Sequence, residues 1–184
     1  MHHIYTTKAF VVHSFPHGES GKFLLLFTKD FGLVGAVAQG IRFSKSKLRS
    51  HLIDFGFANV SLVRGKEVWR VTGAQEIEHQ KKNIIQIKIL RLLKRLLHGE
   101  EKNEKLFEIV EKLYQIEIDE TDFDNVECLT VLRILNSLGY ISKNDKYSNL
   151  LESTDIDHGQ IDLIKEIKPE IIKTINQSLK ESHL

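Results

Sequence analysis

Short hydrophobic runs, rich in Val, Phe, Leu and Thr, alternate with turn residues through the first 79 positions of the chain. Turn signals follow the first, second and fourth runs, at Pro16-His17-Gly18, Asp30-Phe31-Gly32 and Gly65-Lys66. Apolar runs bounded by such turns are typical of strands. The pattern predicts five strands without proline, at residues 8–14, 22–30, 32–40, 55–64 and 67–77.

The spacing of these predicted strands indicates how they are arranged. Most are joined without a helical stretch between them, which favours an antiparallel sheet or a small barrel. The longest connection separates the third and fourth strands and includes residues 41–51, IRFSKSKLRSH. Five strands with a larger insertion at that point have the layout of an OB-fold, and closure into a barrel would protect such apolar strands from pairing with other chains.

From about residue 80 the hydrophobic period changes to that of amphipathic helices, with apolar residues three and four positions apart. We expect Gly99 and Gly139 to cap the helices that precede them, because glycine is common just after a helix C-terminus. Pro169 suits the first turn of a final helix, where its missing N–H would be unpaired anyway. The predicted segments are helices at 83–99, around 106–113 and at 123–140, a polar connector at 141–158, and a helical closing segment.

The fold class that these patterns predict is α+β, with an N-terminal five-stranded OB-fold barrel followed by a C-terminal helical bundle. We place the boundary so that residues 1–79 form a nucleic-acid-binding domain and residues 80–184 an α-helical partner or scaffold domain. The longest apolar runs, such as residues 23–27, are far shorter than the roughly 20 residues that cross a bilayer. No signal-peptide pattern opens the sequence, so we expect a cytoplasmic protein with no membrane partner.

Charge is divided unequally along the chain, although the net charge is only +1. Residues 1–98 contain 16 lysines and arginines against 6 acidic residues, whereas residues 99–184 contain 10 against 19. An asymmetry of this size predicts that the first half binds a polyanion and that the second half does not.

The connection at residues 41–51 concentrates this positive charge, because Arg42, Lys45, Lys47 and Arg49 lie within eight positions and no acid lies among them. Like charges repel one another, so the loop adds little to folding by itself, and an anion lying across it would explain its composition. We predict that the four side chains contact phosphates, which gives affinity but little sequence preference. Phe43 lies among them and either stacks on a base or is a core or lid residue; the sequence does not decide between the two.

Lys88, Arg91 and Arg95 step by three and four positions, so they share one face of a predicted helix. That face either extends the path of the anion, binds an acidic peptide or is simply solvated. Trp69 and most phenylalanines fall on predicted strands in apolar company. These aromatic side chains either stack on bases or pack in the core. We expect core packing for nearly all of the phenylalanines, which are Phe10, Phe15, Phe23, Phe27, Phe31, Phe55 and Phe57.

No arrangement of residues typical of catalysis is present in the sequence. Glycine loops for nucleotides, a GxSxG nucleophile motif and zinc-ligand spacing among the nine histidines are all missing. The single cysteine, Cys128, excludes an internal disulfide and a cysteine zinc site. We therefore expect a binding protein rather than an enzyme, with no metal and no cofactor.

The N-terminal half also resembles a known family. The first matching feature is a strand that ends before Pro16. The others follow in this order: Gly18-Glu19, Phe27-Thr28, Gly32, Ala38, Gly40, Arg42, Lys45-Ser46-Lys47-Leu48, Leu52, Phe55 and Ala74-Gln75-Glu76-Ile77. In this order and spacing, over residues 8–79, they resemble the N-terminal domain of the bacterial RecO recombination mediators. In the helical half, Leu138-Gly139-Tyr140 and the closing helix carry a weaker resemblance.

The resemblance implies a protein of DNA repair and recombination that is not an enzyme. Members of the family bind single- and double-stranded DNA, anneal complementary strands and, with the partner RecR, help load RecA onto DNA coated by single-strand-binding protein. They also bind the acidic C-terminal tail of that coating protein, for which Lys88, Arg91 and Arg95 are the candidates here. Arg42, Lys45, Lys47 and Arg49 match the family's basic loop. The implied location is the cytoplasm, in association with the nucleoid.

One departure from the family concerns metal binding. Many members carry a four-cysteine zinc knob after the Leu-Gly-Tyr segment, whereas residues 141–158 contain no cysteine. Two other functions stay open beside the family's. The protein is an adaptor whose barrel and basic loop bind an acidic protein partner, or it is an OB-fold protein that binds RNA.

Overall fold

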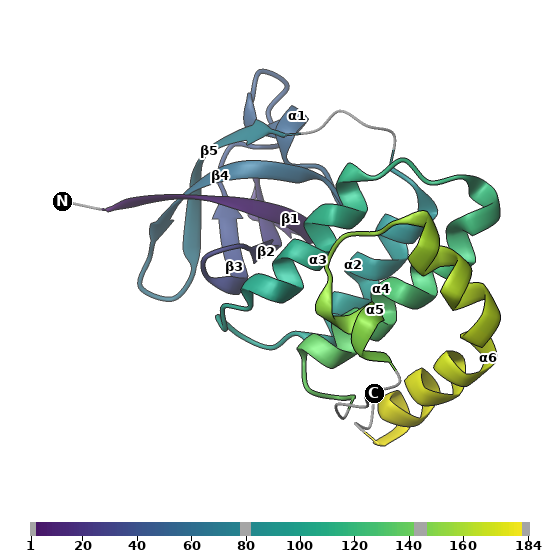
Figure 1. Cartoon of the computed structure of the whole chain (residues 1–184). Helices are drawn as coiled ribbons and strands as arrows, with labels where there is room; N and C mark the ends of the chain where they lie inside the picture. Colours follow the sequence, from purple (N-terminus) through teal and green to yellow (C-terminus); the bar gives the residue numbers. More distant parts are fainter. Residues whose placement is uncertain (1–2, 78–81, 142–146, 182–184) are drawn as a thin grey trace. The chain divides into compact units, whose positions relative to one another are not determined.

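The computed structural model describes residues 3–77, 82–141 and 147–181 (Figure 1). By their internal contacts these residues divide into two compact units, Met1–Asn103 and Glu104–Leu184. The domain boundary expected after residue 79 lies outside the described residues, and the helix that follows it belongs to the first unit.

The first unit is built on five strands that close into a barrel, in the order β1-β2-β3-β5-β4. Neighbouring strands are antiparallel, except that β3 and β5 are parallel. A one-turn helix, α1 (Leu48–His51), lies in the connection between β3 and β4. This arrangement is an OB-fold, so the predicted fold class is confirmed. The strands are β1 (Ile4–His17), β2 (Gly21–Thr28), β3 (Gly32–Ala38), β4 (Phe57–Arg64) and β5 (Trp69–Glu76).

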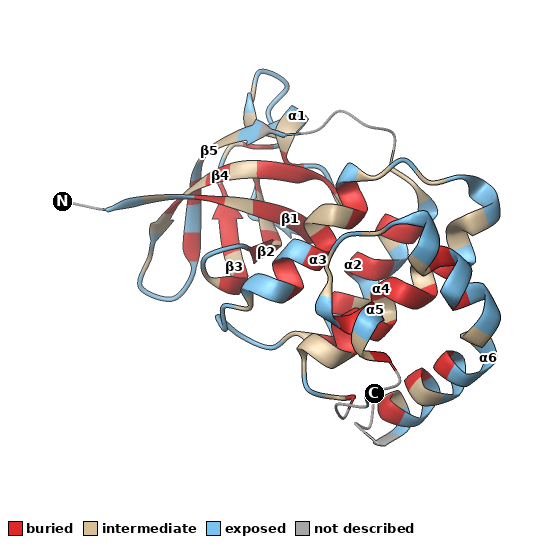
Figure 2. Cartoon of the chain, viewed as in Figure 1, coloured by how far each residue is buried: buried red, intermediate tan, exposed pale blue. Residues whose placement is uncertain are grey.

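Alternation of side chains along each strand decides which residues fill the barrel. On β2, for example, Leu24 and Leu26 are fully buried in the barrel core, so Phe23, Leu25 and Phe27 face outward. Figure 2 shows the resulting buried segments on the strands. The barrel core consists mainly of Ala9, Val11, Leu24, Leu26, Val34, Ala36, Val60, Leu62 and Trp69.

Helix α2 (Ile84–Leu96) completes the first unit and contacts β1. Its start is fixed by a capping box, in which Asn83 Oδ1 accepts from the Gln86 N–H at 2.9 Å and Gln86 Oε1 accepts from the Asn83 N–H at 3.1 Å. The prediction that Gly99 caps this helix is wrong. The helix ends at Leu96 with an extended residue after it, and the Gly99 carbonyl instead accepts from the Leu33 N–H at 3.2 Å.

The second unit is helical, and α4 is its centre because α3, α5 and α6 all contact it. Figure 2 shows α4 as largely buried, and most of its residues are indeed buried on every side. A short 3-10 turn, η1, leads into α4. The elements are α3 (Glu104–Gln115), η1 (Glu120–Asp122), α4 (Phe123–Ser137), α5 (Ser148–Glu152) and α6 (His158–Glu181).

The ends of these helices test two of the glycine and proline predictions. Gly139 has φ +79° and follows α4 as expected; its N–H donates to the Asn136 carbonyl at 3.0 Å, and the Tyr140 N–H donates to the Leu135 carbonyl at 2.9 Å, which is a Schellman motif. The prediction that Pro169 opens the final helix is wrong, because Pro169 lies inside α6.

The earlier start of α6 has a local cause. Asp157 Oδ1 accepts from the Gln160 N–H at 2.8 Å, and Gln160 Oε1 accepts from the Asp157 N–H at 3.3 Å, so an Asp-x-x-Gln capping box begins the helix within the segment expected to be a connector. That segment also contains α5.

Candidate nucleic-acid interface

The connection between β3 and β4, residues 39–56, is held to the barrel at both ends. Ile41 and Leu52 are each 1% exposed and belong to the barrel core. Between them the backbone closes successive turns, with the Ser46 N–H donating to the Phe43 carbonyl at 3.0 Å and the Leu52 N–H to the Leu48 carbonyl at 3.0 Å. The cations of this loop are therefore displayed on a fixed backbone, which reduces the entropy lost when they bind.

Arg42 is tied to the neighbouring β1–β2 turn. Its backbone N–H donates to the Ser20 carbonyl at 3.0 Å, and its Nη1 donates to the Glu19 carbonyl at 3.2 Å and to the Gly18 carbonyl at 3.5 Å. The side chain is nevertheless exposed. Arg42 thus joins two loops of the barrel and keeps guanidinium donors for a phosphate, a structural role that the sequence did not indicate.

Lys45, Lys47 and Arg49 differ from Arg42, because their side chains are exposed and form no hydrogen bond or ion pair with any residue that the structure describes. Lys45 and Lys47 precede α1, and Arg49 lies within it. The three cations therefore lie along one short segment that ends at the buried Leu52. Unpaired cations on a held loop repel one another and cost folding free energy, which an anionic ligand would offset. Their contact with DNA stays a prediction.

Phe43 is 62% exposed, so the core alternative for this residue is wrong. Its ring lies over Gly40, where an added Cβ would be 3.4 Å from the ring. Together with His17 and Gly18 it lines a shallow hollow at the β1–β2 turn. The ring is therefore presented beside Arg42, with one side available to a ligand such as a base.

The predicted basic face of α2 is exposed at Lys88, Arg91 and Arg95. The structure brings it to the end of the basic loop, since the Arg91 guanidinium lies over the Phe55 ring at 5.6 Å from its centroid. Phe55 has φ +61°, an unusual value for a residue with a side chain, and its N–H donates to the Val11 carbonyl at 2.7 Å. Residues 39–56 thus connect the β1–β2 turn at one end with the basic face of α2 at the other.

The phenylalanines divide into two groups that the sequence did not separate. Phe10, Phe27, Phe57 and Trp69 are at most 3% exposed, as predicted for core packing. Phe15 is 47% exposed, so the core prediction is wrong for this residue. Its ring stacks on that of Phe23, with centroids 5.0 Å apart. These two rings lie on the outer face of β1 and β2, where the sequence analysis preferred core packing to base stacking.

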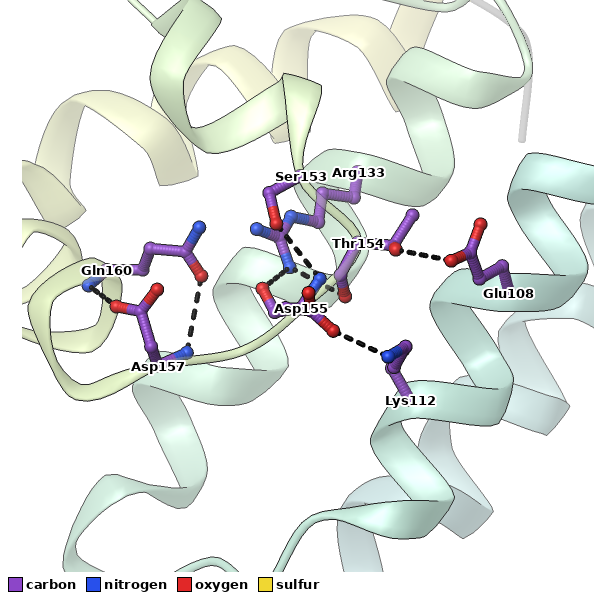
Figure 3. Close-up of polar contacts among 8 residues, drawn as sticks. All are labelled: Glu108, Lys112, Arg133, Ser153, Thr154, Asp155, Asp157 and Gln160. Atoms are coloured by element: carbon purple, nitrogen blue, oxygen red, sulfur yellow. Dashed lines mark hydrogen bonds and ion pairs between the residues drawn. The ribbon is translucent and has the colours of Figure 1, made fainter.

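The second unit contains a buried charge that the sequence analysis also passed over. Arg133 on α4 is 1% exposed, and Figure 3 shows it reaching the segment between α5 and α6. Its Nε donates to the Leu150 carbonyl at 2.7 Å, and its Nη1 donates to the Asp155 carbonyl at 2.9 Å and the Thr154 carbonyl at 3.3 Å. Burial lowers the pKa of Arg133 to about 10, so the side chain stays charged at neutral pH. The only signal was a lone arginine in the apolar stretch Leu132–Leu135.

Metal and thiol chemistry find little support in the described part of the chain. No group of three His, Cys, Asp or Glu side chains among residues 3–77, 82–141 and 147–181 is placed to hold a metal ion. Cys128 is buried, and burial raises the pKa of its thiol, which keeps it protonated and unreactive at neutral pH. Within the same residues, no helix combines the length and the apolar character that spanning a membrane requires.

Comparison with known sequences adds to this geometry. Residues 1–79 match the family model described as "Recombination protein O N terminal". Among curated proteins, the chain is similar to a "DNA repair protein RecO" from Dehalococcoides mccartyi, with 42% identity over 76 residues. Proteins of the same name from Desulfitobacterium hafniense and Thermoanaerobacter sp. are 28% identical over 145 residues and 27% identical over 148 residues.

The extent of these matches differs. The first covers 41% of this chain and 30% of the Dehalococcoides protein. The other two cover 74% and 76% of this chain, and 52% and 59% of the respective relatives. The similarity therefore reaches from the barrel into the helical unit, while the chain spans less than two thirds of the length of these relatives.

Proposed function

We propose that the chain is a DNA-binding recombination mediator in DNA repair, because residues 1–79 match the family model of the RecO N-terminal domain. The names of the relatives, all DNA repair proteins, support this role. The observation that carries the proposal is the basic loop, in which Lys45, Lys47 and Arg49 are exposed and unpaired among the described residues.

The mechanism that we propose is electrostatic and requires no bond-making chemistry. Cations of the loop neutralise phosphates and release the counterions condensed on DNA, which drives binding with little sequence preference. Once phosphate charge is neutralised, two complementary strands approach each other with less repulsion. This is the physical basis for strand annealing and for the handling of single-stranded DNA before RecA is loaded.

We propose two protein partners, of which one has a candidate site among the same charges. The acidic tail of single-strand-binding protein is assigned to the face formed by Lys88, Arg91 and Arg95, since these side chains are exposed on one side of α2. RecR is proposed as a partner from family membership alone. The proposed location is the cytoplasm, in association with the nucleoid.

The test is a titration of the full chain with a labelled single-stranded oligonucleotide at several salt concentrations, read by fluorescence anisotropy. We expect Lys45/Lys47/Arg49→Ala to weaken binding and to reduce the slope of log K against log salt by about 2, because each lost phosphate contact on a single strand contributes about 0.7. Arg42 is left in place because it holds the β1–β2 turn.

The matched control removes three exposed lysines elsewhere in the chain, Lys29, Lys173 and Lys180, and so changes the net charge by the same amount. We expect the control to keep the wild-type slope. Equal slopes in the wild type and the loop variant would contradict the phosphate role of the loop. Binding of an acidic peptide without any binding of DNA would instead favour the adaptor, and a preference for RNA over a DNA oligomer of the same sequence would favour an RNA-binding protein.

A further inference from the structure

A row of outward-facing residues crosses four strands of the barrel. The Cα register pairs Phe15 on β1 with Phe23 on β2, Phe23 with Val37 on β3, and Val37 with Arg70 on β5. Next to these residues along the strands, Leu24 on β2, Ala36 and Ala38 on β3, and Trp69 and Val71 on β5 belong to the barrel core, and Val37 itself is only 8% exposed. Since side chains alternate along a strand, these four residues, which we name the outer row, face away from the core.

The aromatic end of the outer row is arranged before any ligand arrives. The Phe15 and Phe23 rings are stacked with 21° between their planes. Gly35 lies beneath Phe23, and a Cβ at this position would be 2.5 Å from the ring Cζ. Glycine therefore lets the Phe23 ring rest directly on the backbone of β3. The pair is fixed from below, while Phe15 remains 47% exposed.

The charges on and near the outer row suit a polyanion. The Arg70 side chain is exposed and forms no hydrogen bond or ion pair with any residue that the structure describes. At the other end, Phe15 lies three positions before Gly18, the first residue of the β1–β2 turn whose carbonyls accept hydrogen bonds from Arg42. No carboxylate belongs to the row; the nearest acids in sequence are Glu19 and Glu67, one on each of the two turns at its ends.

We propose that the outer row is a stacking platform for unpaired bases of a single-stranded nucleic acid, with Phe15 and Phe23 contacting bases and Arg70 contacting the phosphate backbone. This inference rests on the proposed DNA-binding function and assigns it a second contact surface beside the basic loop. A base within a duplex has both faces covered by its neighbours, so only an unpaired base stacks on the rings. The platform would thus distinguish single strands, whereas the cations of the loop attract phosphates of either form.

The charges favour a nucleic acid over an apolar peptide. A docking site for an apolar helix or strand needs an extended hydrophobic surface. Here the exposed aromatic surface is limited to the Phe15–Phe23 pair, and the row that contains this pair ends at the cation Arg70. Stacking rings combined with a positively charged path is the combination that binds single strands without sequence preference.

The variant that tests the proposal is Phe15→Leu/Phe23→Leu in the full chain. Leucine keeps an apolar side chain on Gly35 but removes the π-faces. We expect the affinity for a labelled oligo(dT) to fall about tenfold, with an unchanged slope of log K against log salt, because stacking is lost and phosphate contacts are not. Affinity for a duplex of the same length should stay that of the wild type. Near-UV circular dichroism checks that both proteins are folded.

A second variant detects the contact directly. Phe15→Trp places an indole on the outer row, and we expect oligo(dT) to quench its fluorescence by stacking. The native Trp69 is 3% exposed and provides the background, which is measured in the wild type. Ile172→Trp, at a 42% exposed position on α6, is the control for non-specific quenching.

The outcomes separate this inference from the proposed function. The platform is overturned if the double leucine variant binds oligo(dT) with wild-type affinity, or if it loses as much affinity for the duplex as for the single strand. This holds even if the basic loop variant loses binding. The outer row would then serve a protein partner or folding. A loss confined to single strands supports the platform even if the loop proves dispensable. Absence of any DNA binding by the wild type overturns both proposals.

Discussion

Gly18 and Gly32 each have a positive φ, of 62° and 68°, yet their surroundings differ. Nothing lies within 4 Å of a Cβ built at Gly18, whereas a Cβ at Gly32 would be 2.2 Å from the Glu101 carbonyl oxygen. At Gly18 the requirement is only for the left-handed conformation of a turn. At Gly32 there is a second requirement, the close approach of the backbone that returns from α2 to the start of β3.

Gly18→Ala and Gly32→Ala should therefore have different effects on stability. We expect Gly18→Ala to lower the free energy of unfolding by about 1 kcal/mol, the cost of placing a side chain in the left-handed region. Gly32→Ala should cost about 3 kcal/mol or more, because the new Cβ meets backbone that cannot move independently. Urea unfolding of both variants measures the difference. Equal losses would mean that residues 97–103 do not hold β3 in the way described.

At the scale of elements, the segment between α5 and α6 is held by polar contacts rather than by an apolar core. Arg133 donates to the carbonyl of Leu150 in α5 and to that of Asp155 in the segment itself. Lys112 on α3 donates to Asp155 Oδ1 at 2.6 Å (Figure 3). The hydrogen bond and the positive charge of Lys112 lower the pKa of Asp155 below the ordinary 3.8. In turn, the hydrogen bond and the negative charge of Asp155 raise the pKa of Lys112 above 10.5. The α3–loop contact is therefore sensitive to pH.

The sign of that sensitivity follows from the lowered pKa of Asp155. The ion pair stabilises the folded state above the ordinary pKa of 3.8, and this stability is lost as the pH falls through the lower folded value. We expect Asp155→Asn to be less stable than the wild type at neutral pH, and the difference to shrink in acid. Urea midpoints from neutral pH to below pH 3 test this expectation.

Asp119→Asn serves as the control, since it removes an exposed carboxylate outside the Lys112–Asp155 pair. A stability difference between Asp155→Asn and the wild type that stays constant in acid would show that the pair does not stabilise the loop. The effect should be small at high salt, because both groups are at the surface.

At the scale of the whole molecule, the near-zero net charge conceals two units of opposite sign. Binding to DNA depends on local charge, because salt screens charges beyond roughly 8 Å at physiological ionic strength. The charge of the basic loop itself, rather than the net charge of the chain, therefore decides whether the loop binds phosphates. It also makes the helical unit a poor DNA surface, so we expect all phosphate contacts to come from the first unit.

This division is tested with Glu117/Glu152/Glu166→Gln, which neutralises three exposed acids of the second unit. We expect the slope of log K against log salt for oligonucleotide binding to stay that of the wild type, since no phosphate contact is gained. A modest gain in affinity at low salt should disappear at physiological salt. A changed slope would mean that the helical unit takes part in DNA binding.

The sequence by itself determined the barrel, the helical unit and the basic loop, and it carried the resemblance to the RecO proteins. Short apolar runs, turn residues and clustered charge are local properties, and each can be recognised without knowing what lies nearby in space. Capping is equally local: Gly139 was predicted, and the Asp157–Gln160 capping box that starts α6 was present in the sequence but was passed over in favour of Pro169.

Only the tertiary structure decided which outward-facing residues are covered. Phe10, Phe23 and Phe27 all alternate with core residues of the barrel, but Phe10 and Phe27 are buried and the Phe15–Phe23 pair lies at the surface. Alternation assigns a side chain to a face of the sheet, whereas burial of that face depends on other parts of the chain that pack against it. For the same reason the sequence does not predict the turn contacts of Arg42 or the buried position of Arg133, because both depend on carbonyl groups that are distant in sequence.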